Sequence, residues 1–191
     1  MQEHPLIEMY ISISDEQQNA FAEQKLASVD LDSVVLRTLE AAGITQPVML
    51  TLLVTDDDGI HDMNKQYREQ DKPTDVLSFP LLEQPLVDAP AEEVWTAQSV
   101  ASGTNASADV PPEFVTPPGM VTNLGDIVMS WTTLVQQANE AGHDPVVELL
   151  YLLSHGVLHL VGYDDQTEAG YQKMVQIQQS VLQALGVKKF H

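Results

Sequence analysis

The chain has 191 residues, 43% of them hydrophobic, which is enough for one compact domain with its own core. Its 28 acidic and 8 basic residues give a formal charge of −20, so at long range it repels nucleic-acid phosphates and anionic membranes. Cysteine is absent, which excludes disulfides, a thiolate nucleophile and a thiolate zinc site, and leaves His, Asp and Glu as possible metal ligands. The N-terminus lacks the basic start and apolar core of a signal peptide, so we expect a cytoplasmic protein.

The N-terminal part of the chain predicts two pairs of a strand and a helix. Residues 6–13 have strand composition, and residues 29–43 follow with apolar positions at helical spacing and Gly43 as a stop signal. Residues 47–55 form a second apolar, β-branched run of strand length. Residues 56–70 then open with carboxylates suited to a helix N-terminus, which predicts the second helix.

Two further strands are predicted on either side of a segment rich in Pro, Ala and Ser. Residues 74–82 read as a strand ended by Pro80, and residues 124–131 alternate between two sides, so the two strands could pair as neighbours. Residues 81–123 between them hold six prolines and no Lys or Arg. We therefore expect one domain over residues 1–191, with a loose and flexible surface insertion at about 81–123.

The last third of the chain predicts helices. A short helix covers residues 132–142, and residues 143–162 form a longer helix in which Asp144 is the N-cap and Pro145 the first helical residue. Because this second helix is apolar nearly all round, we expect it to be central. Residues 167–186 are amphipathic and should pack over the surface.

The central helix carries the pattern that points to chemistry. His155 and His159 differ by about 40° in azimuth and about 6 Å in rise, so both imidazoles can reach one metal ion. Gly162 allows the chain to turn back, and Asp165 can then supply a third ligand. Two histidines and one carboxylate leave a coordination position open for water, which is the arrangement of a hydrolytic zinc site. The oxygen donor makes manganese or iron more competitive with zinc.

The alternative is that the two histidines are simply packed or hydrogen-bonded in a buried helix. Gly156 costs a helix interior about 1 kcal/mol, and buried imidazoles cost more unless they find partners, which favours a functional role. Gly156 also stands where the H-E-x-x-H pattern of zinc proteases has its general base, which argues against peptide hydrolysis. The base stays open between Asp164 and a phosphate oxygen of the substrate.

Three blocks of the sequence resemble the YbeY family of bacterial endoribonucleases. Residues 155–165, "HGVLHLVGYDD", resemble the family signature H-G-x-L-H-L-x-G-Y-D-H, except that Asp165 stands where the family has its third metal-binding His. Residues 67–80, "YREQDKPTDVLSFP", and residues 124–130, "LGDIVMS", resemble the other two blocks in the right order. The resemblance covers most of the chain from about residue 48 onward.

The resemblance implies an α+β fold with a small mixed sheet and a zincin-like central metal-binding helix. It implies a metal-dependent, single-strand-specific endoribonuclease that matures ribosomal RNA at the 3′ end of the small-subunit RNA and acts in ribosome quality control. His155 and His159 correspond to metal ligands, with Asp165 as the expected third ligand of one divalent ion, Zn²⁺ or else Mn²⁺ or Fe²⁺. Arg68 matches the family's functionally important arginine and could grip a phosphate bidentately, although it could also simply balance the nearby Glu69.

The expected partners follow from the same resemblance. They are ribosomal RNA and the small ribosomal subunit or its associated proteins, which could present the substrate in spite of the charge of −20. We expect neither a membrane nor DNA as a partner. Two alternatives remain: a zincin-like metalloprotease, and a non-catalytic ribosome-associated binding protein with a decayed metal site, for which the His lost at position 165 is the main indication.

Overall fold

The computed structural model describes residues 6–27, 29–72, 74–95 and 121–186. Its strands are β1 (Leu6–Ser12), β2 (Val48–Thr55), β3 (Val76–Pro80) and β4 (Thr122–Ser130). Its helices are α1 (Glu16–Leu26), α2 (Leu31–Ala41), α3 (Asp57–Arg68), α5 (Trp131–Ala141), α6 (Pro145–Val161) and α7 (Glu168–Ala184), with a short 3-10 helix η1 (Ala91–Glu93).

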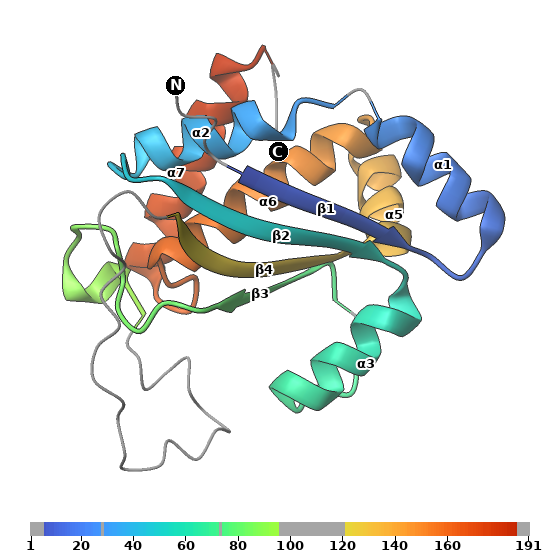
Figure 1. The fold of residues 1–191 in the computed structure, drawn as a ribbon, viewed down its shortest axis with the longest axis horizontal. Coiled ribbons are helices and arrows are strands. Elements are labelled where there is room, and N and C mark those ends of the chain that lie inside the picture. Colours follow the sequence, from blue (N-terminus) through green and yellow to red (C-terminus); the bar gives the residue numbers. More distant parts are fainter. Residues whose placement is uncertain (1–5, 28, 73, 96–120, 187–191) are drawn as a thin grey trace.

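The four strands form one mixed sheet in the order β1-β2-β4-β3 (Figure 1). β1, β2 and β4 run parallel, whereas β3 is antiparallel to β4, with Val76 opposite Met129. The two strands that the sequence placed on either side of the Pro-rich segment are therefore neighbours, and β3 lies at one edge of the sheet. This topology confirms the predicted α+β class with a small mixed sheet.

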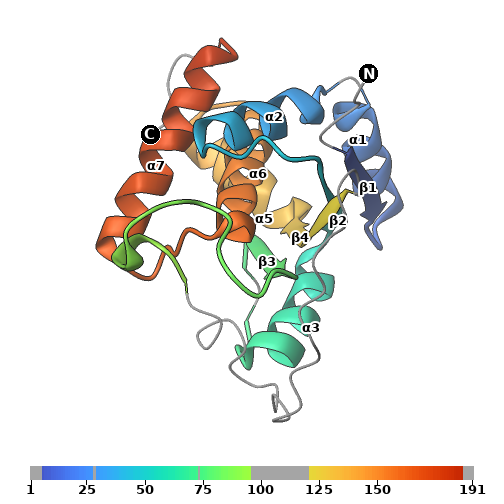
Figure 2. The same cartoon turned by 60° about the vertical axis from the view of Figure 1, so that its left-hand side comes forward.

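Helices cover both faces of the sheet, but unequally. α3 lies alone on one side, where Ile60 packs on Leu77 of β3 and Val128 of β4 (Figures 1 and 2). Side chains alternate between the two faces of a strand, so Ile127 and Met129, on either side of Val128, point to the other face. There they join the large core beneath α2 and α6. The period of two along β3 and β4 thus divides each strand between two cores.

α6 is the central helix, as its sequence predicts, and it packs on β3, β4, α2, α5 and α7. Gly156 allows its close approach to the sheet, because a Cβ there would lie 2.8 Å from Cδ1 of Ile127 on β4. The glycine therefore has a packing reason besides any link to the neighbouring histidines. Of the helices that the structure describes, none alone is long and apolar enough to span a membrane; α5 and α6 reach the required length and composition only as a pair bent by 114°.

Two features differ from the sequence prediction. The pattern did not predict α1, of which only Ala22 and Leu26 are buried, so it lacks a periodic apolar stripe. The last predicted strand was expected to include Trp131, but the strand ends at Ser130. The hydroxyl of Ser130 accepts the N–H of Thr133 at 3.3 Å and so caps the start of α5.

The expected loose insertion at 81–123 is packed along its first part. Within residues 81–95, Val87 is 8% exposed and Trp95 is 2% exposed. The physical reason is that this stretch lies against the C-terminal end of α6, whose last carbonyl groups need hydrogen-bond donors. Residues 96–120 lie outside the described residues.

Candidate active site

The C-terminal half of α6 carries His155 and His159 one turn apart. Asp144 starts the helix by accepting the N–H of Val146 at 2.9 Å, and Gly162 ends it at a φ of 139° that favours glycine. Both histidines are partly exposed, although most of the residues around them in α6 are buried. Their imidazoles therefore reach the surface of an otherwise buried helix.

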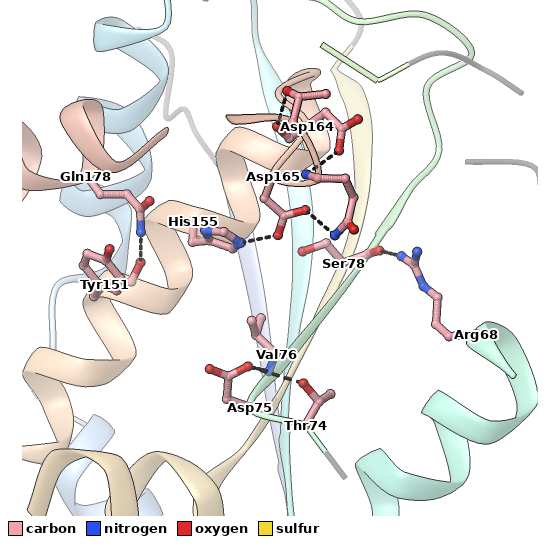
Figure 3. A network of polar contacts seen from close by, with 12 residues as sticks. Arg68, Thr74, Asp75, Val76, Ser78, Tyr151, His155, Asp164, Asp165 and Gln178 are labelled. Atoms are coloured by element: carbon pink, nitrogen blue, oxygen red, sulfur yellow. Dashed lines mark hydrogen bonds and ion pairs between the residues drawn. The ribbon is translucent and has the colours of Figure 1, made fainter. Parts of the chain in front are cut away.

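The loop after α6 returns Asp165 to the first of these histidines. Oδ2 of Asp165 lies 3.3 Å from Nε2 of His155, and Oδ1 accepts the side-chain N–H of Gln166 at 3.1 Å (Figure 3). Asp164, next to it, accepts the backbone N–H of Gln166 at 2.9 Å instead. Of the two aspartates, Asp165 is the one whose carboxylate is aimed at α6, as the spacing of the sequence predicts.

The electrostatics of this group favour an ionised carboxylate at Asp165 and a neutral imidazole at His159. The hydrogen bond from His155 lowers the pKa of the Asp165 carboxyl well below its usual range, against the opposing effect of burial. Burial lowers the pKa of the His159 imidazole, and the carboxylate of Asp165 acts in the opposite direction. An ionised carboxylate and a neutral imidazole are the protonation states in which these side chains bind metals.

Two imidazoles and one carboxylate are suitable ligand types for a divalent metal ion, but their spacing in the structure is not that of a metal site. Asp165 contacts His155, and its carboxylate lies within electrostatic reach of His159. However, across residues 6–27, 29–72, 74–95 and 121–186, no group of three or more His, Asp or Glu side chains is spaced to hold a metal ion as it stands. The site with His155, His159 and Asp165 as ligands therefore stays a prediction.

Arg68 reaches the same region from the far side of β3. It is the last residue of α3, and its guanidinium donates a hydrogen bond to the backbone carbonyl of Ser78 on the open edge of β3 (Figure 3). Desolvation lowers the pKa of Arg68, and the nearby carboxylate of Asp165 partly offsets that effect. The structure thus brings Arg68 within electrostatic reach of Asp165 and His159. One bond to Ser78 leaves other guanidinium N–H groups for a ligand.

A strap formed by residues 86–95 holds the end of α6, and sequence reasoning did not identify it. Trp95 is its main anchor, because the indole Nε1 donates to the carbonyl of His159 at 2.6 Å and the backbone N–H donates to Gly162 at 2.9 Å. The strap also fixes the loop that follows, since the N–H of Asp164 donates to the carbonyl of Glu93 at 2.9 Å. The presence of a Trp in a Pro-rich segment was the one signal in the sequence. The strap satisfies carbonyl groups that the helix end leaves free and so positions both His159 and Asp165.

A groove of about 510 Å³ lies along the turns of α6 that precede His155. Its walls are acidic, with Asp75 from β3, Glu140 from α5 and Glu148 from α6. Glu148 is buried and bonded to His143 at 2.9 Å. The groove is therefore lined by three acidic side chains, one of which is paired with a histidine.

Comparison with known proteins places the chain in a family. The family described as Endoribonuclease YbeY matches residues 12–186. The chain is 36% identical over 160 residues to "Endoribonuclease YbeY" of Roseiflexus sp. strain RS-1, covering 83% of this chain and 84% of that protein. It is 35% identical over 181 residues to "Endoribonuclease YbeY" of Moorella thermoacetica, covering 95% of this chain and 100% of that protein. Among solved structures, the solution structure of TM1509 from Thermotoga maritima is similar with a TM-score of 0.47 and 21% identity, covering 93% of this chain and 91% of that one. The extent of the family match, over nearly the whole chain and all three motif blocks, shows that this chain belongs to the YbeY family of endoribonucleases.

Proposed function

We propose that the chain is a metal-dependent endoribonuclease that cuts single-stranded RNA in the maturation of ribosomal RNA, at the 3′ end of the small-subunit RNA, and in ribosome quality control. The observation that carries the proposal is the contact of 3.3 Å between Asp165 and His155, one turn from His159, in a member of an endoribonuclease family. We place the protein in the cytoplasm, with ribosomal RNA and the small subunit or its proteins as partners.

The residues of α6 and its following loop would hold one divalent ion, Zn²⁺ or else Mn²⁺ or Fe²⁺. His155 and His159 would supply nitrogen ligands and Asp165 an oxygen ligand, which leaves a position for water. When bound, such an ion lowers the pKa of a water molecule towards about 7 and polarises a phosphoryl oxygen. Trp95 holds the carbonyl of His159, and this bond keeps the second histidine at a fixed place on the helix end.

Arg68 would bind the phosphate at which the RNA is cut. Its guanidinium is positioned by the carbonyl of Ser78 and is in electrostatic contact with Asp165, so it can neutralise charge that develops on phosphate oxygens. The overall charge of −20 predicts weak and strongly salt-dependent binding of free RNA. Presentation of the RNA by the ribosome or by a partner protein would overcome this repulsion.

Replacement of Arg68 by alanine should slow RNA cleavage by about 100-fold, because it removes a donor aimed at the reacting phosphate. Arg68→Lys should recover only part of the rate, since lysine keeps the charge but not the planar fork. The rates are measured with a single-stranded RNA at low ionic strength and in the presence of Zn²⁺ or Mn²⁺. The matched control is Arg37→Ala on the exposed side of α2, which removes the other arginine of the chain. Cleavage by Arg68→Ala at the parent rate would show that Arg68 is only a surface residue.

A further inference from the structure

Exposed nonpolar side chains gather on the α3 side of the β3 edge. Tyr67 and Leu81 are each 59% exposed, the largest fractions among the exposed hydrophobic residues that the structure describes. Tyr67 packs on Phe79 of β3, which is itself only partly buried, and Leu81 follows Phe79 by two residues. Tyr67 is the next-to-last residue of α3, so no further turn of the helix follows to cover its side chain.

The rings in this group have an ordered arrangement. The rings of Tyr67 and Phe79 pack edge to face, with centroids 5.6 Å apart and an interplanar angle of 71°. Cζ of Arg68 lies 5.5 Å from the centroid of the Phe79 ring. The row formed by Tyr67, Phe79 and Arg68 is called the aromatic row below. It starts at an exposed ring and ends at the guanidinium that bonds to the carbonyl of Ser78.

Several basic residues are close to this row in the sequence. Of the Lys and Arg residues in the described ranges, half lie within residues 65–72. The Lys and Arg residues in the described ranges are Lys25, Arg37, Lys65, Arg68, Lys72 and Lys173. Exposed acidic residues share the segment, among them Glu69 and Asp71, so the attraction is local rather than long-range. In contrast, the groove along the earlier turns of α6 is lined by Asp75, Glu140 and Glu148 and by no Lys or Arg of the described residues, which disfavours a phosphate there.

We propose that the aromatic row is a stacking platform for a base of the single-stranded RNA substrate, next to the phosphate held by Arg68. The inference rests on the proposed function and adds the direction in which the RNA lies: over the β3 edge towards α3, and away from the acidic groove. The Tyr67 ring is largely exposed, and an unstacked base has a flat apolar face that can pack against it. Stacking of bases on aromatic rings is a common way in which proteins bind single-stranded RNA. A double-stranded RNA, whose bases are stacked on each other, should not use the platform.

Binding to an inactive variant tests the platform without cleavage. In a His159→Ala background, a short unstructured RNA that contains one 2-aminopurine is titrated at low ionic strength. Tyr67→Ala should weaken binding about tenfold and abolish the quenching of 2-aminopurine that stacking causes, whereas Tyr67→Phe should keep both. The matched control is Tyr171→Ala, which removes a tyrosine that is 49% exposed on α7. Circular dichroism melting is used to check that each variant is folded.

The outcomes separate the platform from the proposed function. If the parent chain cleaves RNA but Tyr67→Ala binds the labelled RNA no more weakly than Tyr171→Ala, the platform is wrong and the nuclease remains. If the parent neither binds nor cleaves single-stranded RNA, whether free at low ionic strength or presented on the small ribosomal subunit, both are wrong. If light scattering shows that the parent is a dimer that Tyr67→Ala dissociates, a second copy of the chain covers the row, and the platform is wrong. Weaker binding and lost quenching in Tyr67→Ala alone, with both retained in Tyr67→Phe, support it.

Discussion

Replacement of His159 by alanine is expected to abolish RNA cleavage and to remove the bound metal. His159 is of intermediate exposure and is not among the buried core residues, so its loss should leave the fold intact. Loss of an outer-shell partner of a metal site already costs about 10-fold to 100-fold, so loss of a direct ligand should slow cleavage by more than about 100-fold. The carbonyl that accepts the Trp95 indole belongs to the backbone and is unaffected. Cleavage of a single-stranded RNA and metal content per chain are measured on the same preparation.

The matched control for this variant is His61→Ala. His61 lies on α3, where its imidazole pairs with the exposed Asp71 at 2.6 Å. Its removal should leave the metal content of the chain unchanged. A His159→Ala protein that keeps a full equivalent of metal and cleaves RNA at the parent rate would exclude His159 from the site.

Replacement of Gly170 by alanine is expected to destabilise the protein and to disturb the loop that carries Asp165. Gly170 lies in the first turn of α7, and a Cβ there would stand 1.9 Å from the carbonyl oxygen of Asp164 and 2.8 Å from that of Glu93. Backbone oxygens cannot rotate away as a side chain can, so the loop or the strap must move. Overpacking of this kind costs about 1 to 3 kcal/mol, which lowers the melting temperature of a chain of this size by about 2 to 12 °C. Thermal melting followed by circular dichroism measures the loss.

Comparison with Gly43→Ala shows whether the effect of Gly170→Ala is local. Gly43, after the end of α2, has a φ of 80°, and a Cβ there would meet no atom within 4 Å. Alanine at this position is strained by its backbone conformation and should cost about 1 to 2 kcal/mol, without any contact with the site. We therefore expect both variants to be less stable but only Gly170→Ala to lose metal. Equal metal content in the two variants would show that Gly170 does not position Asp165.

The fold was predictable wherever a single segment contains its own signal. The strand and helix pairs of the N-terminal half, the neighbouring β3 and β4, and the central α6 with its Asp144 cap all follow from local periodicity and capping residues. α1 was not predictable, because only Ala22 and Leu26 contribute to the core and no apolar stripe repeats along it. Its stability comes from packing and from the cap formed by Asp15, which a pattern of apolar residues does not record.

The candidate site was predictable as far as one helix and its following loop determine it. His155 and Asp165 are ten residues apart, and the fixed geometry of a helix followed by a glycine turn is enough to bring them together. The role of Trp95 was not predictable, because its indole meets the carbonyl of a residue 64 positions away. Every residue has a backbone carbonyl, so the sequence does not indicate which residue accepts such a hydrogen bond. The placement of Arg68 at the β3 edge likewise depends on how α3 packs on the sheet.

The most direct test of a metal centre built on His155, His159 and Asp165 is the metal content of the chain. Plasma mass spectrometry is applied to untagged parent protein and to Asp165→Ala after dialysis against Zn²⁺ and, separately, Mn²⁺, with Asp165→His as the variant that supplies a different ligand. The account predicts about one equivalent in the parent, a clear loss in Asp165→Ala and retention in Asp165→His. A parent chain without metal under both conditions, or an Asp165→Ala protein with as much metal as the parent, would contradict it.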